Sequence, residues 1–234
     1  MGQVLMVNYI SPRRIVIAGL LLASAVAASA QTRDHAPASL PSANRMAQDS
    51  PGSESWTYAQ PSSRFHKYGT VIVEPTRVYR GPDAQFEDID PADRSRFADI
   101  ITDELRTEVA KTFPAPAKPQ TDTLRLRVTL LGARKTKGGV ATATRVTPFG
   151  FAANSAKSLL GKEGRFTGSV LCAVELYDAK TNELLLAAVR RRSPDPLDVP
   201  ATLSTTETVK AVARELADSV RHRLENLTGR GGNR

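Results

Sequence analysis

The stretch Gly168–Val189, GSVLCAVELYDAKTNELLLAAV, decides the fold. In its first half apolar residues recur at every second position, which is typical of a strand with one buried face. Its second half is an apolar return run, and a polar turn at 178–182 separates the two halves. The stretch therefore predicts a β-hairpin made of two long strands.

Two further strands are predicted on the N-terminal side of this hairpin. Leucine and valine at positions 124, 126, 128 and 130 alternate with Arg125, Arg127 and Thr129, which indicates a half-buried strand with a cationic outer face. The β-branched run Thr70–Val73 ends before Pro75 and predicts a buried first strand.

Two amphipathic helices complete the pattern. Asp90 and Pro91 are suited to a helix start, and apolar residues then recur at helical spacing through Val109. Near the C-terminus, Ser204–Glu207 forms a capping box, and Gly229 follows the last apolar position. The predicted order is β-α-β-insert-β-β-α. The expected fold class is α/β (α+β), a small mixed sheet with both helices on one face.

The N-terminus indicates export. Arg13 and Arg14 precede a short apolar run, which closes on Ala28-Ser29-Ala30. A basic start, a short apolar run and an A-x-A pattern predict a signal peptide over residues 1–30, cleaved before Gln31. The alternative is a segment that is retained as an anchor. Cleavage would place the mature chain in the periplasm or outside the cell, with peripheral association with the outer membrane as a variant.

Composition divides the rest of the chain. Residues 31–63 are rich in Ser, Pro, Ala and Gln, which predicts a disordered tether. Trp56 and Tyr58 are its exceptions, and they would either dock on the domain or mark a partner-binding spot. Residues 64–228 are expected to form a single domain with an insert at 138–164, and residues 229–234 a disordered basic tail.

No catalytic signature is present in the sequence. Nucleophile, phosphate-loop and zinc motifs are absent, and the single Cys172 alternates with valines as a buried residue would. We therefore predict no catalytic, cofactor or metal residues. Acidic residues around the first helix start are interpreted as capping residues rather than calcium ligands. Two function classes stay open: a non-enzymatic envelope accessory, and a periplasmic hydrolase whose site no motif reveals.

Basic residues form three groups, and the insert is the best candidate for recognition. The groups are Arg125 with Arg127; Arg134, Lys135, Lys137 and Arg145; and Arg190 to Arg192. They would form an anion-binding patch if they converge, but we favour basic residues that protect edge strands. Phe149 and Phe151 offer apolar anchors inside the insert, so the expected partner-binding residues are Phe149, Phe151, Arg134, Lys135 and Arg145. The alternative is that both aromatics cover the sheet.

These segments resemble a known family. Tyr68–Pro75, the helix Phe97–Phe113, the strand Asp122–Leu131 and the hairpin that begins at Gly168 are similar, in the same order, to domain-of-unknown-function family 3313. The resemblance covers residues 56 to 227 and implies a bacterial envelope protein. Many members look like lipoproteins, whereas this chain has no cysteine directly after the small residues at 28–30. The family offers no established catalytic residues.

The formal charge of +8 bears on partners rather than on the fold. In the cell envelope an envelope protein, a glycan or an anionic lipid is the expected partner, and nucleic acid is not. The apolar run at 15–28 is shorter than a bilayer span, so we expect no transmembrane span in the mature chain.

Overall fold

A computed structural model describes residues 37, 39–86, 88–135, 168–195 and 204–231. Its elements are η2 (Ala43–Arg45), β1 (Ala47–Gln48), β2 (Trp56–Ala59), η3 (Ser62–Phe65), β3 (Thr70–Val73), β4 (Arg77–Val78), α1 (Pro91–Val109), β5 (Thr123–Arg134), β6 (Ser169–Asp178), β7 (Leu184–Arg192) and α4 (Thr205–Thr228). In this part of the chain seven strands form one open, mostly antiparallel sheet, which confirms the predicted α+β class.

Strand pairing follows the order β1-β2-β7-β6-β5-β3, and β4 also pairs with β5. The predicted hairpin is confirmed, with Val174 opposite Ala188 across β6 and β7. β3 and β4 both run parallel to β5. A parallel pair needs a long crossover, and α1 lies in the connection that leads to β5.

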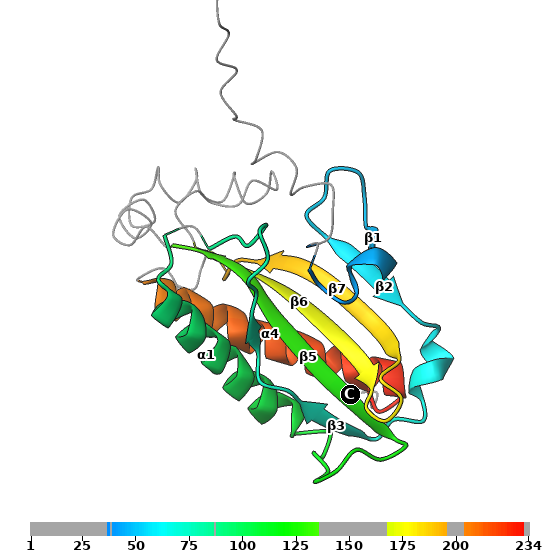
Figure 1. Ribbon diagram of the computed structural model, residues 1–234. Helices are drawn as coiled ribbons and strands as arrows, with labels where there is room; N and C mark the ends of the chain where they lie inside the picture. Colours follow the sequence, from blue (N-terminus) through cyan, green and yellow to red (C-terminus); the bar gives the residue numbers. More distant parts are fainter. Residues whose placement is uncertain (1–36, 38, 87, 136–167, 196–203, 232–234) are drawn as a thin grey trace, which may run out of the picture. The chain divides into compact units, whose positions relative to one another are not determined.

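Both helices cover the same face of the sheet, as predicted (Figure 1). The main core joins the apolar stripes of α1 and α4 to the even-numbered apolar positions of β5 and β6. The helix starts differ in detail: the Ser204 hydroxyl accepts a hydrogen bond from the Glu207 amide at 3.2 Å, whereas Asp90 makes no side-chain cap. Gly229 ends α4 with a φ of 74°, a left-handed conformation that glycine adopts without strain.

The N-terminal segment is part of this fold. β2 pairs with β7, and Trp56 is buried on the face away from the helices, together with Leu171 and Val189. The prediction of a disordered tether through residue 63 is therefore wrong from residue 39 onward. Composition predicted disorder because most residues of this segment are polar. The segment is nevertheless part of the fold, because Trp56 and Tyr58 pack on the domain and β2 pairs with the otherwise free edge of β7. Of the two interpretations of Trp56, docking on the domain is confirmed.

The predicted tail also begins later than expected. The amides of Arg230 and Gly231 both donate to the Glu225 carbonyl, at 2.9 and 3.1 Å. The disordered tail predicted from residue 229 is wrong for these positions, because they close the C-terminus of α4. The predicted signal peptide and the insert at 138–164 lie outside the described residues. Among the helices that are described, none has the length and apolarity that a membrane crossing requires.

The buried carboxylate of Asp178 joins the hairpin turn to the loop between η3 and β3. Asp178 accepts hydrogen bonds from the Tyr68 hydroxyl at 2.7 Å and from the amides of Lys180 and Thr181 at 2.9 Å. Lys67 forms an ion pair with the same carboxylate at 3.1 Å. Burial alone would raise the pKa of Asp178, but these donors outweigh burial and hold the pKa well below its usual range.

This lowered pKa predicts an acid sensitivity. The stabilisation is present above the unfolded-state pKa of about 4 and is lost as pH falls toward the lower folded-state pKa. Asp178→Asn should lower the free energy of unfolding by roughly 1.5–3 kcal/mol at pH 7, since bonds to a charged group are lost. Urea titrations from pH 7 to pH 3 check this. Equal acid slopes for the wild type and Asp178→Asn would contradict it.

Candidate functional site

A groove lies between α4 and the β6–β7–β2 side of the sheet. Its volume is about 270 Å³, close to the lower end of ligand pockets. Along the buried strands β6 and β7, Val174 and Ala188 are half-buried, because they face this groove. The lining combines an apolar floor with basic and hydroxyl groups at its margin: Thr57, Cys172, Val174, Leu186, Ala188, Arg190, Arg192, Leu216, Ser219, Val220 and Arg223.

The three arginines of the groove are not equivalent. Arg190 is engaged already: it forms an ion pair with Asp49 at 2.7 Å and donates to the Thr57 hydroxyl at 2.8 Å. Among the described residues, Arg192 forms a hydrogen bond only with the Ser219 hydroxyl, at 3.5 Å. Arg223 is exposed on α4 and forms no hydrogen bond or ion pair with the described residues. Arg192 and Arg223 therefore offer two guanidinium groups from opposite walls.

Cys172 belongs to the floor of the groove and is unsuited to nucleophilic chemistry. Its side chain is buried, which raises the pKa of the thiol to about 12. Arg192 opposes this effect only in part. A thiol is a nucleophile as its thiolate, so Cys172 acts here as a small apolar residue.

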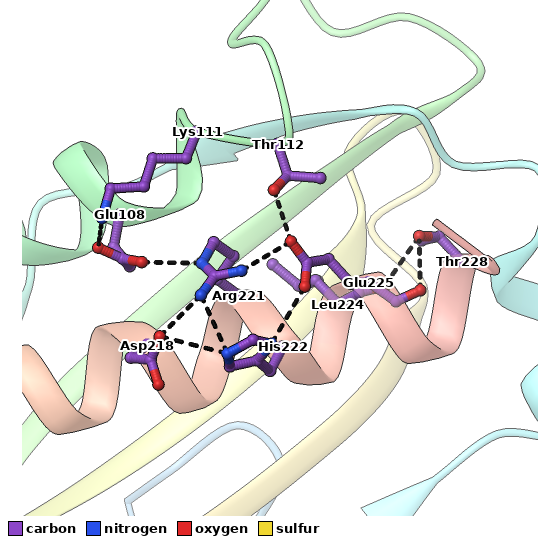
Figure 2. A network of polar contacts seen from close by, with 9 residues as sticks. All are labelled: Glu108, Lys111, Thr112, Asp218, Arg221, His222, Leu224, Glu225 and Thr228. Atoms are coloured by element: carbon purple, nitrogen blue, oxygen red, sulfur yellow. Dashed lines mark hydrogen bonds and ion pairs between the residues drawn. The ribbon is translucent and has the colours of Figure 1, made fainter. Parts of the chain in front are cut away.

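A clasp of charged side chains holds α4, one wall of the groove, against α1. Arg221 forms ion pairs with Glu108 of α1 and Glu225 of α4, both at 2.8 Å (Figure 2). The Thr112 hydroxyl donates to Glu225 at 2.6 Å, also from beyond the end of α1. Hydrogen bonds to Glu108 and Glu225 raise the pKa of Arg221 above its ordinary value. The clasp fixes the register of the two helices.

His222 and Asp90 show no arrangement suited to catalysis or metal binding in the described part of the chain. His222 lies on α4 within 3.4 Å of Asp218 and 3.2 Å of Glu225, inside the same clasp. Asp90, from the predicted capping cluster, starts α1 without a side-chain bond. In the described ranges no group of three or more His, Cys, Asp or Glu side chains could hold a metal ion.

The first and third predicted basic groups do not converge, and Lys137 and Arg145 of the second group lie outside the described residues. Arg125 and Arg127 share Glu74 at 3.1 and 2.9 Å on the helix-free face. Burial tends to raise the pKa of Glu74, but the two arginines lower it below its usual range. The triplet at 190–192 splits by strand periodicity, and Arg191 pairs with Glu54 at 2.9 Å on the face opposite Arg190.

The interpretation of these arginines as edge protection is also wrong. β5 has neighbours on both sides, and β7 lies between β6 and β2. The sequence pattern missed this because β2 comes from the segment that was assigned to the tether. Of the predicted partner-binding residues, Arg134 is half-buried at the end of β5 and Lys135 is exposed beside it.

The remaining three, Arg145, Phe149 and Phe151, lie outside the described residues, so recognition by the insert stays a prediction. Arg223 is not among the residues predicted to bind a partner. A signal was available: Arg223 lies seven positions after Leu216, on the margin of the apolar stripe of α4.

Sequence comparison identifies the family. Residues 39–220 match the family described as protein of unknown function (DUF3313). This chain belongs to the DUF3313 family. The match confirms the resemblance drawn from the strand and helix segments. No curated protein matches the chain.

Several solved structures are similar to this DUF3313 protein at low identity. A PelC dodecamer from Paraburkholderia phytofirmans is 18% identical, with 73% of this chain and 95% of that chain covered and a TM-score of 0.37. A DUF4136 family protein from Bacteroides thetaiotaomicron is 12% identical, with 74% and 96% covered and a TM-score of 0.34. A Xanthomonas campestris protein of family DUF330 is 10% identical, with 74% and 91% covered and a TM-score of 0.37.

Proposed function

We propose that this protein is an exported, non-enzymatic envelope protein that binds an anionic amphiphile in the groove between α4 and β7. The observation that carries the proposal is the pairing of an apolar floor with Arg192 and Arg223 on opposite walls. An apolar chain would lie on the floor around Val174 and Ala188. The anionic head would accept hydrogen bonds from the two guanidinium groups.

The charges around the groove favour an anion over a cation. Asp49 is neutralised by Arg190, so the two other arginines give the margin a positive balance. Cations at the margin of an apolar pocket match a ligand with a charged head and a hydrocarbon tail. Anionic lipids of the cell envelope have this chemistry.

Binding of dodecyl phosphate, measured by calorimetry below its micelle concentration, tests the proposal. Arg192→Gln combined with Arg223→Gln should weaken binding at least tenfold, because each lost charge-assisted bond is worth about 1.5–3 kcal/mol. Arg214→Gln, at an exposed position of α4, is the matched control and should bind as the wild type does. Dodecyl maltoside, with the same tail and a neutral head, should bind more weakly than dodecyl phosphate.

Equal affinity of the wild type and the double variant for dodecyl phosphate would overturn the groove assignment.

The export part of the proposal has its own test. Fractionation of cells that express the full chain should yield a periplasmic protein whose first residue is Gln31, as the A-x-A pattern at 28–30 predicts. An uncleaved chain in the inner membrane would contradict it.

A further inference from the structure

A second pocket opens on the opposite, helix-free face of the sheet. Its volume is about 440 Å³, and β4, the loop after it, the N-terminal segment and the middle of β5 and β6 enclose it. The polar residues that matter here are Tyr79, Arg80, Arg127, Thr129 and Glu175. None of them takes part in the α4–β7 groove.

Glu175 is the unusual member of this pocket. Its residue exposure is only 1%, yet it lies among the residues that line the pocket. One carboxylate oxygen, Oε1, accepts a hydrogen bond from the Tyr177 hydroxyl at 2.9 Å. The other, Oε2, is buried without a hydrogen-bond partner in the described part of the chain. A buried carboxylate oxygen without a donor is costly, so such a group calls for an explanation.

Three arginines, Arg77, Arg80 and Arg127, line the same pocket, and none of them donates to Glu175 Oε2. Arg127 directs its Nε to Glu74 at 2.9 Å, and its guanidinium lies 4.9 Å from the centre of the Tyr177 ring. Arg80 is exposed at the pocket and has no hydrogen bond or ion pair with any described residue. Within the described residues, the pocket thus contains a hydrogen-bond acceptor without a donor, Glu175 Oε2, and a guanidinium without an acceptor, that of Arg80.

We propose that this pocket binds a small carboxylic acid that carries a hydroxyl or ammonium group beside its carboxylate. The ligand carboxylate pairs with Arg80, where a guanidinium offers two parallel donors. The neighbouring hydroxyl or ammonium donates to Glu175 Oε2 and satisfies the buried oxygen. An acid without such a donor would place nothing opposite Glu175. The pocket therefore selects for a ligand that carries both a carboxylate and a neighbouring hydrogen-bond donor. Sugar acids and amino acids both have this combination.

Three probes separate these sources. Glucuronate carries hydroxyls, D-alanine carries an ammonium group, and cyclohexanecarboxylate shares a carboxylate on a six-membered ring but has no donor. Titration of the ¹⁵N-labelled protein, followed by amide chemical shifts on β4, β5 and β6, reports binding at this pocket. We expect one of the first two acids to bind at least tenfold more tightly than cyclohexanecarboxylate. Which of them binds identifies the donor.

Two variants assign the effect to the named side chains. Glu175→Gln keeps an acceptor for Tyr177 but places an amide donor where Oε2 stands, so it should weaken the preferred acid at least tenfold. Arg80→Gln should weaken it similarly without changing the melting temperature, because Arg80 is exposed. Arg214→Gln is the matched control for a lost surface arginine.

The melting temperature of Glu175→Gln distinguishes a ligand-binding role of Glu175 from a purely structural role, because the two roles predict changes of opposite sign. If the unpaired oxygen is kept for a ligand, removing its charge should leave the melting temperature equal or higher. A fall of several degrees would show that Glu175 serves the fold alone and would overturn the proposal. So would equal binding of the three acids, or unchanged binding of the preferred acid by Arg80→Gln.

Discussion

Trp56→Ala should lower the free energy of unfolding by about 3–5 kcal/mol, the range for a buried aromatic truncated to alanine. Trp56 is 5% exposed and packs with Leu171 and Val189 on the helix-free face. Among the described strands, β2 joins the sheet through β7 alone, and the short edge strand β1 pairs with β2 on its other side. The change therefore removes the main apolar anchor of the N-terminal segment.

Urea denaturation of the chain from Gln31 onward measures this effect. Thr57→Ala, one position along the same strand, is the matched control. It loses the hydroxyl that accepts from Arg190 and should cost no more than about 1.5 kcal/mol. A loss below about 1 kcal/mol for Trp56→Ala would show that residues 39–65 do not contribute to the cooperative core.

The second large effect concerns the layer between the helices and the sheet. Leu105 is completely buried and Leu216 is 3% exposed, and both belong to the core that α1 and α4 share with β5 and β6. Truncation of either to alanine should cost about 2–5 kcal/mol, since it removes transfer energy and leaves a cavity.

The exposed neighbour Arg106 supplies the control, because Arg106→Ala should change stability by no more than about 0.5 kcal/mol. Thermal unfolding followed by circular dichroism compares the three variants. Stability changes near zero at both leucines would mean that the helices do not pack on the sheet as described. Loss at Leu216 alone would indicate that α1 is dispensable, which the shared core does not allow.

The candidate sites were less accessible from sequence than the fold. Arg190 and Arg192 were visible as members of a triplet, but their groove needs Leu216 and Arg223 from α4 as its other wall. Glu175 lies between the alternating apolar positions of β6, and nothing local shows that residues 39–41 and the loop after β4 close over it. A site built from four separate segments leaves no spacing signature in the chain.

The sequence by itself determined the elements whose signals are short-range. Alternation over 168–189 produced the hairpin, the Ser204 cap and Gly229 bounded α4, and helical spacing identified the buried stripe of α1. These patterns are readable because the geometry of a strand or a helix repeats within a few residues.

Tertiary structure alone decided which strand completes the sheet and how charges are shared between its faces. Thr57 and Arg190 meet across 133 positions of sequence, and the pairing of β2 with β7 makes β7 an interior strand and buries Trp56. The physical reason is that an open strand edge binds any compatible segment whose apolar anchors fit the neighbouring core, wherever that segment lies in the chain.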